Sequence, residues 1–134
     1  MNIKLPALPA ERRLESLKTW NMVLAALHAV QGIVILAISR DFSLPLTTAF
    51  LKFDAQTRGL VPELATWTMV KIGPLVAAFL FLSALAHLIN VLDFDWYRDN
   101  LKRHINPSRW IEYSVSATLM LVVIALLVGV YDVA

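Results

Sequence analysis

Three long apolar blocks dominate the chain, and segments rich in charged residues separate them. The blocks cover about residues 19–38, 66–92 and 107–131. An α-helix rises about 1.5 Å per residue, so about 20 apolar residues can cross the roughly 30 Å core of a bilayer. The pattern therefore predicts an all-α integral membrane fold with three transmembrane helices.

The connection between the first two blocks, residues 39–65, has a different character. It contains Pro45, Gly59 and Pro62, and residues 42–53 are rich in aromatic and β-branched residues. Such residues favour strands, and prolines and glycines favour the turns that join them. The sequence therefore predicts a β-hairpin in this loop of an otherwise helical chain.

Two further prolines bear on the helices. Pro74 lies inside the second block and predicts a kink there. Asn106-Pro107 predicts a helix N-cap followed by proline at the first helical position. The remaining segments are a charged N-terminal segment, a charged second connection and a short end, at residues 1–18, 93–106 and 132–134.

Composition supports the membrane prediction and excludes several classes of function. Only 16% of residues are charged and 58% are hydrophobic, whereas soluble domains average about 25% charged. The first block is longer than the apolar core of a signal peptide, about 7–15 residues, and reads as a retained helix. A net charge of +2 gives no indication of nucleic-acid binding, and there is no cysteine. No nucleophile–base pair, phosphate-binding loop or metal motif appears, so the sequence predicts neither an enzyme nor a metal site.

Basic residues predict the orientation of the helices. The N-terminal segment and the second connection, with Arg109 at its edge, carry eight Lys and Arg residues, against three or four in the first connection. Basic residues are more frequent in cytoplasmic loops. The sequence therefore predicts a multi-pass protein of the cell membrane with a cytoplasmic N-terminus.

Each apolar block carries one ionisable side chain at a similar depth. His28, His87 and Glu112 lie about 7–12 Å from the same predicted end of their helices. A carboxylate at such depth costs a few kcal/mol and needs a partner. Glu112 could pair with Arg109 at the interface, or the three groups could tie helices together at about 0.6 kcal/mol per hydrogen bond. Alternatively, a carboxylate beside two imidazoles can hold or relay a proton.

Four short motifs around these residues resemble the heliorhodopsins, a family of retinal-binding seven-helix photoreceptors. The motifs are Trp20-Asn21 with His28 and Gln31, then Asp41-Phe42-Ser43-Leu44-Pro45-Leu46-Thr47, Leu82-Ser83-Ala84-Leu85-Ala86-His87, and Arg109-Trp110-Ile111-Glu112-Tyr113-Ser114. The resemblance covers about residues 20–133. It implies that the three predicted helices correspond to the first three of the seven-helix bundle.

The resemblance implies a role for each of these polar positions. Glu112 would be the counterion of the protonated retinal Schiff base, and Ser83 would be a hydrogen-bonding group beside it. His28 and His87 would belong to a polar, proton-accepting cluster. The family also implies a cytoplasmic N-terminus, homodimers, an outer-loop hairpin and light sensing rather than ion pumping. Further positions that could contact the chromophore are Tyr113, Ser116 and Met120.

One feature departs from the family. Heliorhodopsins attach retinal through a lysine of the seventh helix, whereas this sequence stops after the third apolar block. Lys71 lies at the wrong end of the second block to replace it. The expectation is an N-terminal portion that binds no retinal covalently by itself and is completed by further helices or by a companion chain. The alternatives are a non-photoactive three-helix interaction subunit and a proton-conducting element built on His28, His87 and Glu112.

Overall fold

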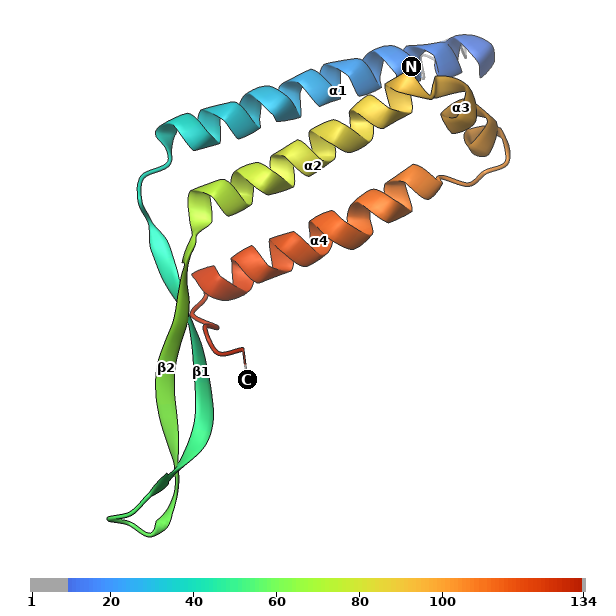
Figure 1. Ribbon diagram of the computed structural model, residues 1–134. Helices are drawn as coiled ribbons and strands as arrows, with labels where there is room; N and C mark the ends of the chain where they lie inside the picture. The colour runs from blue at the N-terminus through green and yellow to red at the C-terminus, as the bar shows by residue number, and fades with distance from the viewer. Residues whose placement is uncertain (1–9, 134) are drawn as a thin grey trace, which may run out of the picture.

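A computed structural model describes residues 10–133. The elements in chain order are α1 (Ala10–Ile38), β1 (Ser43–Asp54), β2 (Gly59–Lys71), α2 (Ile72–Leu92), α3 (Phe94–Lys102) and α4 (Pro107–Leu127). In Figure 1, α1, α2 and α4 run side by side with α2 in the middle, and the hairpin β1–β2 extends away from one end of the helices. The fold is thus three long helices with a two-stranded antiparallel sheet, and all-α is too narrow a description of it.

Within residues 10–133, three helices are long and apolar enough to cross a membrane: Arg12–Ile38, Ile72–Leu92 and Pro107–Leu127. Many of their large apolar side chains are exposed; the exposed fraction is 60% for Ile33 and 67% for Leu121. Such surfaces suit contact with lipid or with further helices. The first helix is continuous from Ala10, so residues 10–18 lead directly into the span. The earlier residues 1–9 lie outside the described part of the chain.

The hairpin is longer than predicted, and it includes residues 66–71, which the sequence assigned to the start of the second span. Thr66 pairs with Thr47, and the ladder continues to Lys71 opposite Ser43, with a bulge between Leu46 and Thr47. The segment 66–71 is apolar enough to resemble a span, but its β-branched and aromatic residues favour a strand. The helix therefore begins at Ile72. Pro74 then falls in the first turn, where its missing N–H removes no helical hydrogen bond, so it does not act as an internal kink.

The hairpin base and the helix ends share a small apolar core. Ile72, Val123 and Leu126 are buried there, and Leu44 and Tyr131 pack against them. After α4 the chain turns at Gly129, whose φ of +93° suits a residue without a Cβ. The third helix thus ends at Leu127, before the predicted 131, and residues 128–133 return to the hairpin.

The returning segment pairs with β1. The Thr47 N–H donates to the Tyr131 carbonyl at 2.8 Å, and the Val133 N–H donates to the Thr47 carbonyl at 3.0 Å. Thr47 and Asp132 form a parallel bridge. The last residues described therefore join α4 to the base of the hairpin.

A short helix, α3, occupies the second connection, where the sequence predicted only a charged loop. The Asp93 side chain caps its start by accepting from the Trp96 N–H at 3.4 Å. Arg98 forms ion pairs with Asp95 at 2.9 Å and with Asp99 at 3.6 Å. The predicted N-cap of the next helix is confirmed: Asn106 accepts from the Arg109 N–H at 3.1 Å, with proline at the first helical position.

Close packing of α1 on α2 depends on Gly32. A Cβ added at Gly32 would lie only 2.7 Å from Cε1 of the Phe81 ring. A small residue at this point lets the two helices approach closely, as is common between membrane helices. Gly32 lies one turn after His28, so this contact sets the spacing of the helices where the polar residues lie.

Candidate functional site

Two histidines from different helices stack at the α1–α2 interface. The rings of His28 and His87 have centroids 5.7 Å apart and planes inclined by only 13°. Both side chains are half-buried. The sequence predicted a similar depth for them, and the structure brings the two rings into contact.

Asn21 is the centre of the hydrogen bonds around this pair. Its Oδ1 lies 2.8 Å from Nδ1 of His87 and accepts a longer bond, 3.4 Å, from Nδ2 of Asn90. Its Nδ2 donates to the backbone carbonyl of Leu17 at 2.8 Å. Asn21 is only 5% exposed and Asn90 only 7%. Asn21, which carried no predicted role, therefore holds one of the two histidines, and Asn90 is bonded to Asn21.

Glu112 reaches the same region from α4. It is half-buried, and its Oε1 accepts a hydrogen bond of 2.9 Å from the hydroxyl of Ser83, which is buried in α2. Ser83 precedes His87 by one helical turn. His28 stacks on His87, and the hydroxyl that holds Glu112 lies one turn from His87 on α2. The carboxylate and the two imidazoles thus form one neighbourhood, in which Ser83 is the direct hydrogen-bond partner of the carboxylate.

No basic side chain of the described residues forms an ion pair with Glu112. The guanidinium of Arg109 instead lies 4.9 Å from the centre of the Tyr113 ring. This geometry contradicts the reading in which Glu112 simply pairs with Arg109 at the helix start. A half-buried carboxylate with one hydroxyl donor remains able to bind a cation.

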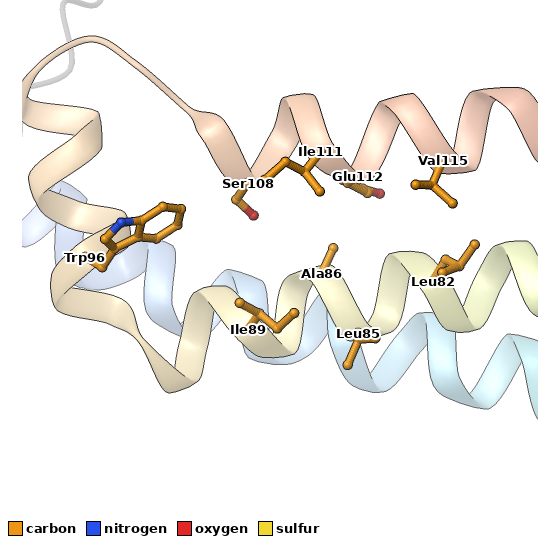
Figure 2. A pocket seen from close by; sticks show the side chains of 9 residues that line it. All are labelled: Leu82, Leu85, Ala86, Ile89, Trp96, Ser108, Ile111, Glu112 and Val115. Carbon is orange, nitrogen blue, oxygen red and sulfur yellow. The ribbon is translucent and has the colours of Figure 1, made fainter.

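A cavity of about 210 Å³ lies between α2 and α4 beside this carboxylate. Figure 2 shows Glu112 on the side of α4 that faces α2, with Trp96 of α3 at the end of the cavity. Apart from Ser108 and Glu112, the lining side chains are hydrophobic: Leu82, Leu85, Ala86, Ile89, Trp96, Ile111 and Val115. The volume is below the roughly 300–1,000 Å³ of ordinary ligand pockets. This cavity is therefore smaller than an ordinary ligand pocket.

The other predicted chromophore contacts fall in different surroundings. Ser116 is 4% exposed, one turn after Glu112 on the same face of α4. Met120 is half-buried. Tyr113 is 47% exposed. None of the three lines the cavity beside Glu112. Among the described residues, no cluster of His, Asp and Glu could hold a metal ion.

Lys71 lies away from this site. It ends β2 and forms an ion pair of 2.8 Å with Asp41 at the base of the hairpin. The hydrogen bond and charge of Lys71 lower the pKa of the Asp41 carboxyl, and Asp41 in turn raises the pKa of Lys71. Lys71 is thus the cation of a surface ion pair with Asp41.

Sequence reasoning missed Asn21 and Asn90, although a signal was present. Asn21 lies seven residues before His28, and Asn90 three residues after His87, so each shares a helix face with its histidine. Buried amides on the face of an intramembrane histidine are themselves an indication of a polar network.

Comparison with known proteins gives one clear match. The model of the family described as heliorhodopsin matches residues 17–134. A search of the curated proteins finds no match to the chain.

Proposed function

The chain belongs to the heliorhodopsin family, and from this premise we propose that it forms the first part of a light-sensing, retinal-binding protein. Its three long apolar helices and its family make it a multi-pass membrane protein. We propose that α1, α2 and α4 correspond to the first three helices of a seven-helix bundle. Further helices, or a companion chain, contribute the lysine that attaches retinal.

The proposed role of Glu112 is that of counterion. The observation that carries it is the half-buried carboxylate, held by the Ser83 hydroxyl at 2.9 Å and unpaired with any cation of the described residues. When bound, retinal would supply a light-absorbing polyene, and the nitrogen of the lysine that attaches it would carry the positive charge. Two unit charges about 4 Å apart attract by about 4 kcal/mol at an effective dielectric constant of about 20. The Glu112 carboxylate therefore suits a cation that another part of the protein would contribute.

The lysines near these helices support the need for a further helix. Lys18 lies 5.6 Å from the centre of the Phe94 ring, and Lys71 pairs with Asp41. Neither side chain is in contact with Glu112. We therefore propose that covalent attachment of retinal requires residues beyond these three helices.

The proposed role of His28 and His87 is to accept a proton. A stacked pair of imidazoles beside a carboxylate can take up one proton, because the positive charge is shared with the hydrogen-bonding groups around it. His87 is the better-connected member, since Asn21 binds it directly. The carboxylate and the imidazoles are then the negative and the proton-accepting parts of one site.

Orientation and assembly follow the same proposal. Basic residues Arg12, Arg13, Lys102 and Arg103 belong to the end of the bundle that carries α3, opposite the hairpin. We propose that this end is cytoplasmic. We also propose a homodimer, and the exposed apolar side chains of the hairpin offer a surface for it: Phe50, Leu51, Phe53, Leu60 and Leu64.

The test is pigment formation by this chain combined with a lysine-bearing helical partner, expressed together in a membrane and supplied with retinal. A visible absorption band should appear only when both parts are present. Removing the charge with Glu112→Gln should lower the pH at which that band titrates by about 3 units, because each unit corresponds to about 1.36 kcal/mol.

Glu63→Gln is the matched control, because Glu63 is exposed on the hairpin and pairs with Lys52. It removes one carboxylate without touching the helices and should leave the band unchanged. A band whose pH titration is the same in Glu112→Gln and in Glu63→Gln would contradict the counterion role.

A further inference from the structure

The orientation of the Asn21 amide is fixed by its surroundings. Its Nδ2 lies 2.8 Å from the backbone carbonyl of Leu17. A carbonyl oxygen can only accept, so the amide nitrogen must lie on this side. The amide oxygen, Oδ1, therefore faces α2. Because the side chain is only 5% exposed, bulk water does not compete for this oxygen.

This orientation determines which nitrogen of His87 carries the proton. The distance from Asn21 Oδ1 to His87 Nδ1 is 2.8 Å, a good hydrogen bond. An amide oxygen has no hydrogen to donate, so Nδ1 must be the donor. In a neutral imidazole the other nitrogen, Nε2, then carries the lone pair.

Asn90 agrees with this assignment and contributes less to it. Its Nδ2 donates to the same oxygen of Asn21 at 3.4 Å. Its own Oδ1 is buried with no hydrogen-bond partner among the described residues. The short bond from His87 is therefore the main contact of Asn21 Oδ1, and Asn90 gives a second, weaker donor.

His28 is not fixed in the same way. Its Nδ1 lies 3.1 Å from Oε1 of Gln31, but Gln31 is exposed and no second contact fixes which end of its amide faces the ring. Either tautomer of His28 can therefore be accommodated by rotation of that amide. Of the titratable side chains around His87, His28 of α1 stacks on it, and Glu112 of α4 is bonded to Ser83, one turn away on α2.

We propose that Asn21 is a positioning residue that holds His87 as the Nδ1–H tautomer and so selects Nε2 as its proton-accepting atom. The tautomer follows from the hydrogen bonds alone, and its use in proton acceptance rests on the proposed function. In an acid titration the incoming proton comes from hydronium. The Nε2 lone pair forms the new N–H bond, water is released, and Nδ1–H stays bonded to Asn21.

The experiment is nitrogen NMR of the full chain labelled with ¹⁵N-histidine, in lipid nanodiscs without retinal. A protonated ring nitrogen and a bare one have well-separated ¹⁵N shifts, so the tautomer is read directly. The chain has three histidines, and loss of signals in His87→Gln assigns those of His87. The expected result is a bare Nε2 and a protonated Nδ1 at neutral pH. A bare Nδ1 in the unmodified chain would overturn the proposal without any variant.

Three variants separate positioning from simple packing. Asn21→Leu removes the acceptor, so the single tautomer should be lost and both forms observed. Asn21→Asp keeps an oxygen acceptor and should restore the Nδ1–H form. Asn90→Leu is the matched control: it removes a buried amide from the same cluster but leaves Asn21 Oδ1 in place, so His87 should stay Nδ1–H. An unchanged tautomer in Asn21→Leu would refute the positioning role.

The same experiment is independent of the light-sensing role. The tautomer is measured in the dark and without retinal, so its failure would leave the counterion test untouched. Conversely, an Nδ1–H form of His87 in a chain that forms no pigment with any lysine-bearing partner would support the role of Asn21 and overturn the proposed function.

Discussion

Replacing Gly32 by alanine tests the helix contact that brings the two histidines together. The added Cβ would lie 2.7 Å from Cε1 and 2.9 Å from Cζ of Phe81. Overpacking of this kind costs about 1–3 kcal/mol. Against it stands the gain of about 0.8–1.0 kcal/mol from replacing glycine by alanine in a helix. The expected net effect in the unmodified chain is a loss of up to about 2 kcal/mol.

Changing Phe81 should reverse the sign of that effect. Phe81→Leu removes Cε1 and Cζ, the two atoms nearest the added Cβ. In this background Gly32→Ala should retain only its helix-forming gain and stabilise the protein by about 0.8 kcal/mol. The coupling energy between the two positions should then be about 1–3 kcal/mol, a factor of about 5–150 in the unfolding equilibrium.

The measurement is equilibrium unfolding of all four proteins in mixed detergent micelles, followed by tryptophan fluorescence. The ring signals of His28 and His87 give a second readout, because separation of α1 from α2 would also weaken their stacking. If Gly32→Ala changed the free energy of unfolding by the same amount in both backgrounds, the close approach of α1 and α2 at this point would be refuted.

Two further predictions concern the hairpin base and the orientation. The pKa of Asp41 is lowered and that of Lys71 is raised relative to their ordinary values of 3.8 and 10.5. The contribution of Asp41 to stability is therefore present above about pH 4 and is lost as the pH falls through its folded pKa. The contribution of Lys71 is present below about pH 10 and is lost as the pH rises through its folded pKa. The measurement is hydrogen exchange of the Ile72 amide, whose N–H donates to the Phe42 carbonyl. In the unmodified chain its protection should be constant from pH 5 to 9 and should fall on acidification, and this acid-induced loss should be absent in Asp41→Asn. An acid-induced loss that persists in Asp41→Asn would contradict the assignment. Because the chain has no cysteine, Arg58→Cys and Arg103→Cys each introduce a single thiol, and an impermeant reagent applied to intact cells should label only Arg58→Cys; labelling of Arg103→Cys alone would reverse the proposed orientation.

The helices were the part of the fold that the sequence pattern predicted best. A run of apolar residues long enough to cross a bilayer has few other solutions, since backbone polar groups must be satisfied within the segment. The Asn106-Pro107 pair marked the start of α4 because a capping amide followed by proline suits a helix N-terminus and little else. These local signals required no knowledge of how the helices pack.

The predicted helix boundaries that were wrong are those where hydropathy and strand propensity disagree. Residues 66–71 are apolar enough to extend a span, yet they form the end of β2, because pairing with residues 43–47 satisfies their backbone groups. α3 was not predicted, although its nine residues have a clear amphipathic pattern, because its many charged residues were interpreted as a loop. In both places a tertiary or local hydrogen bond decided the structure, and neither is visible in hydropathy.

The site was predictable as a list of residues and not as an arrangement. Depth along each helix placed His28, His87 and Glu112 near one another. Rotation of each helix about its axis, which the sequence did not provide, decides that His87 bonds to Asn21 while Glu112 bonds to Ser83. Arg109 lies over the ring of Tyr113, one turn later on the same helix, and the carboxylate has no basic partner among the described residues. The counterion role of Glu112 stays a proposal.

Residues 131–133 give the hairpin a mechanical connection to α4. Because Thr47 is hydrogen-bonded through both its N–H and its carbonyl to the segment that follows α4, a tilt of α4 would also move this part of β1. From Thr47 to Asp54 the strand extends about 23 Å, at about 3.3 Å per residue. A rotation of only about 5° at the foot would therefore sweep the tip by about 2 Å. The hairpin has in this sense the geometry of a lever arm: a small movement of the helix that carries Glu112 would become a larger displacement at the far surface of the molecule.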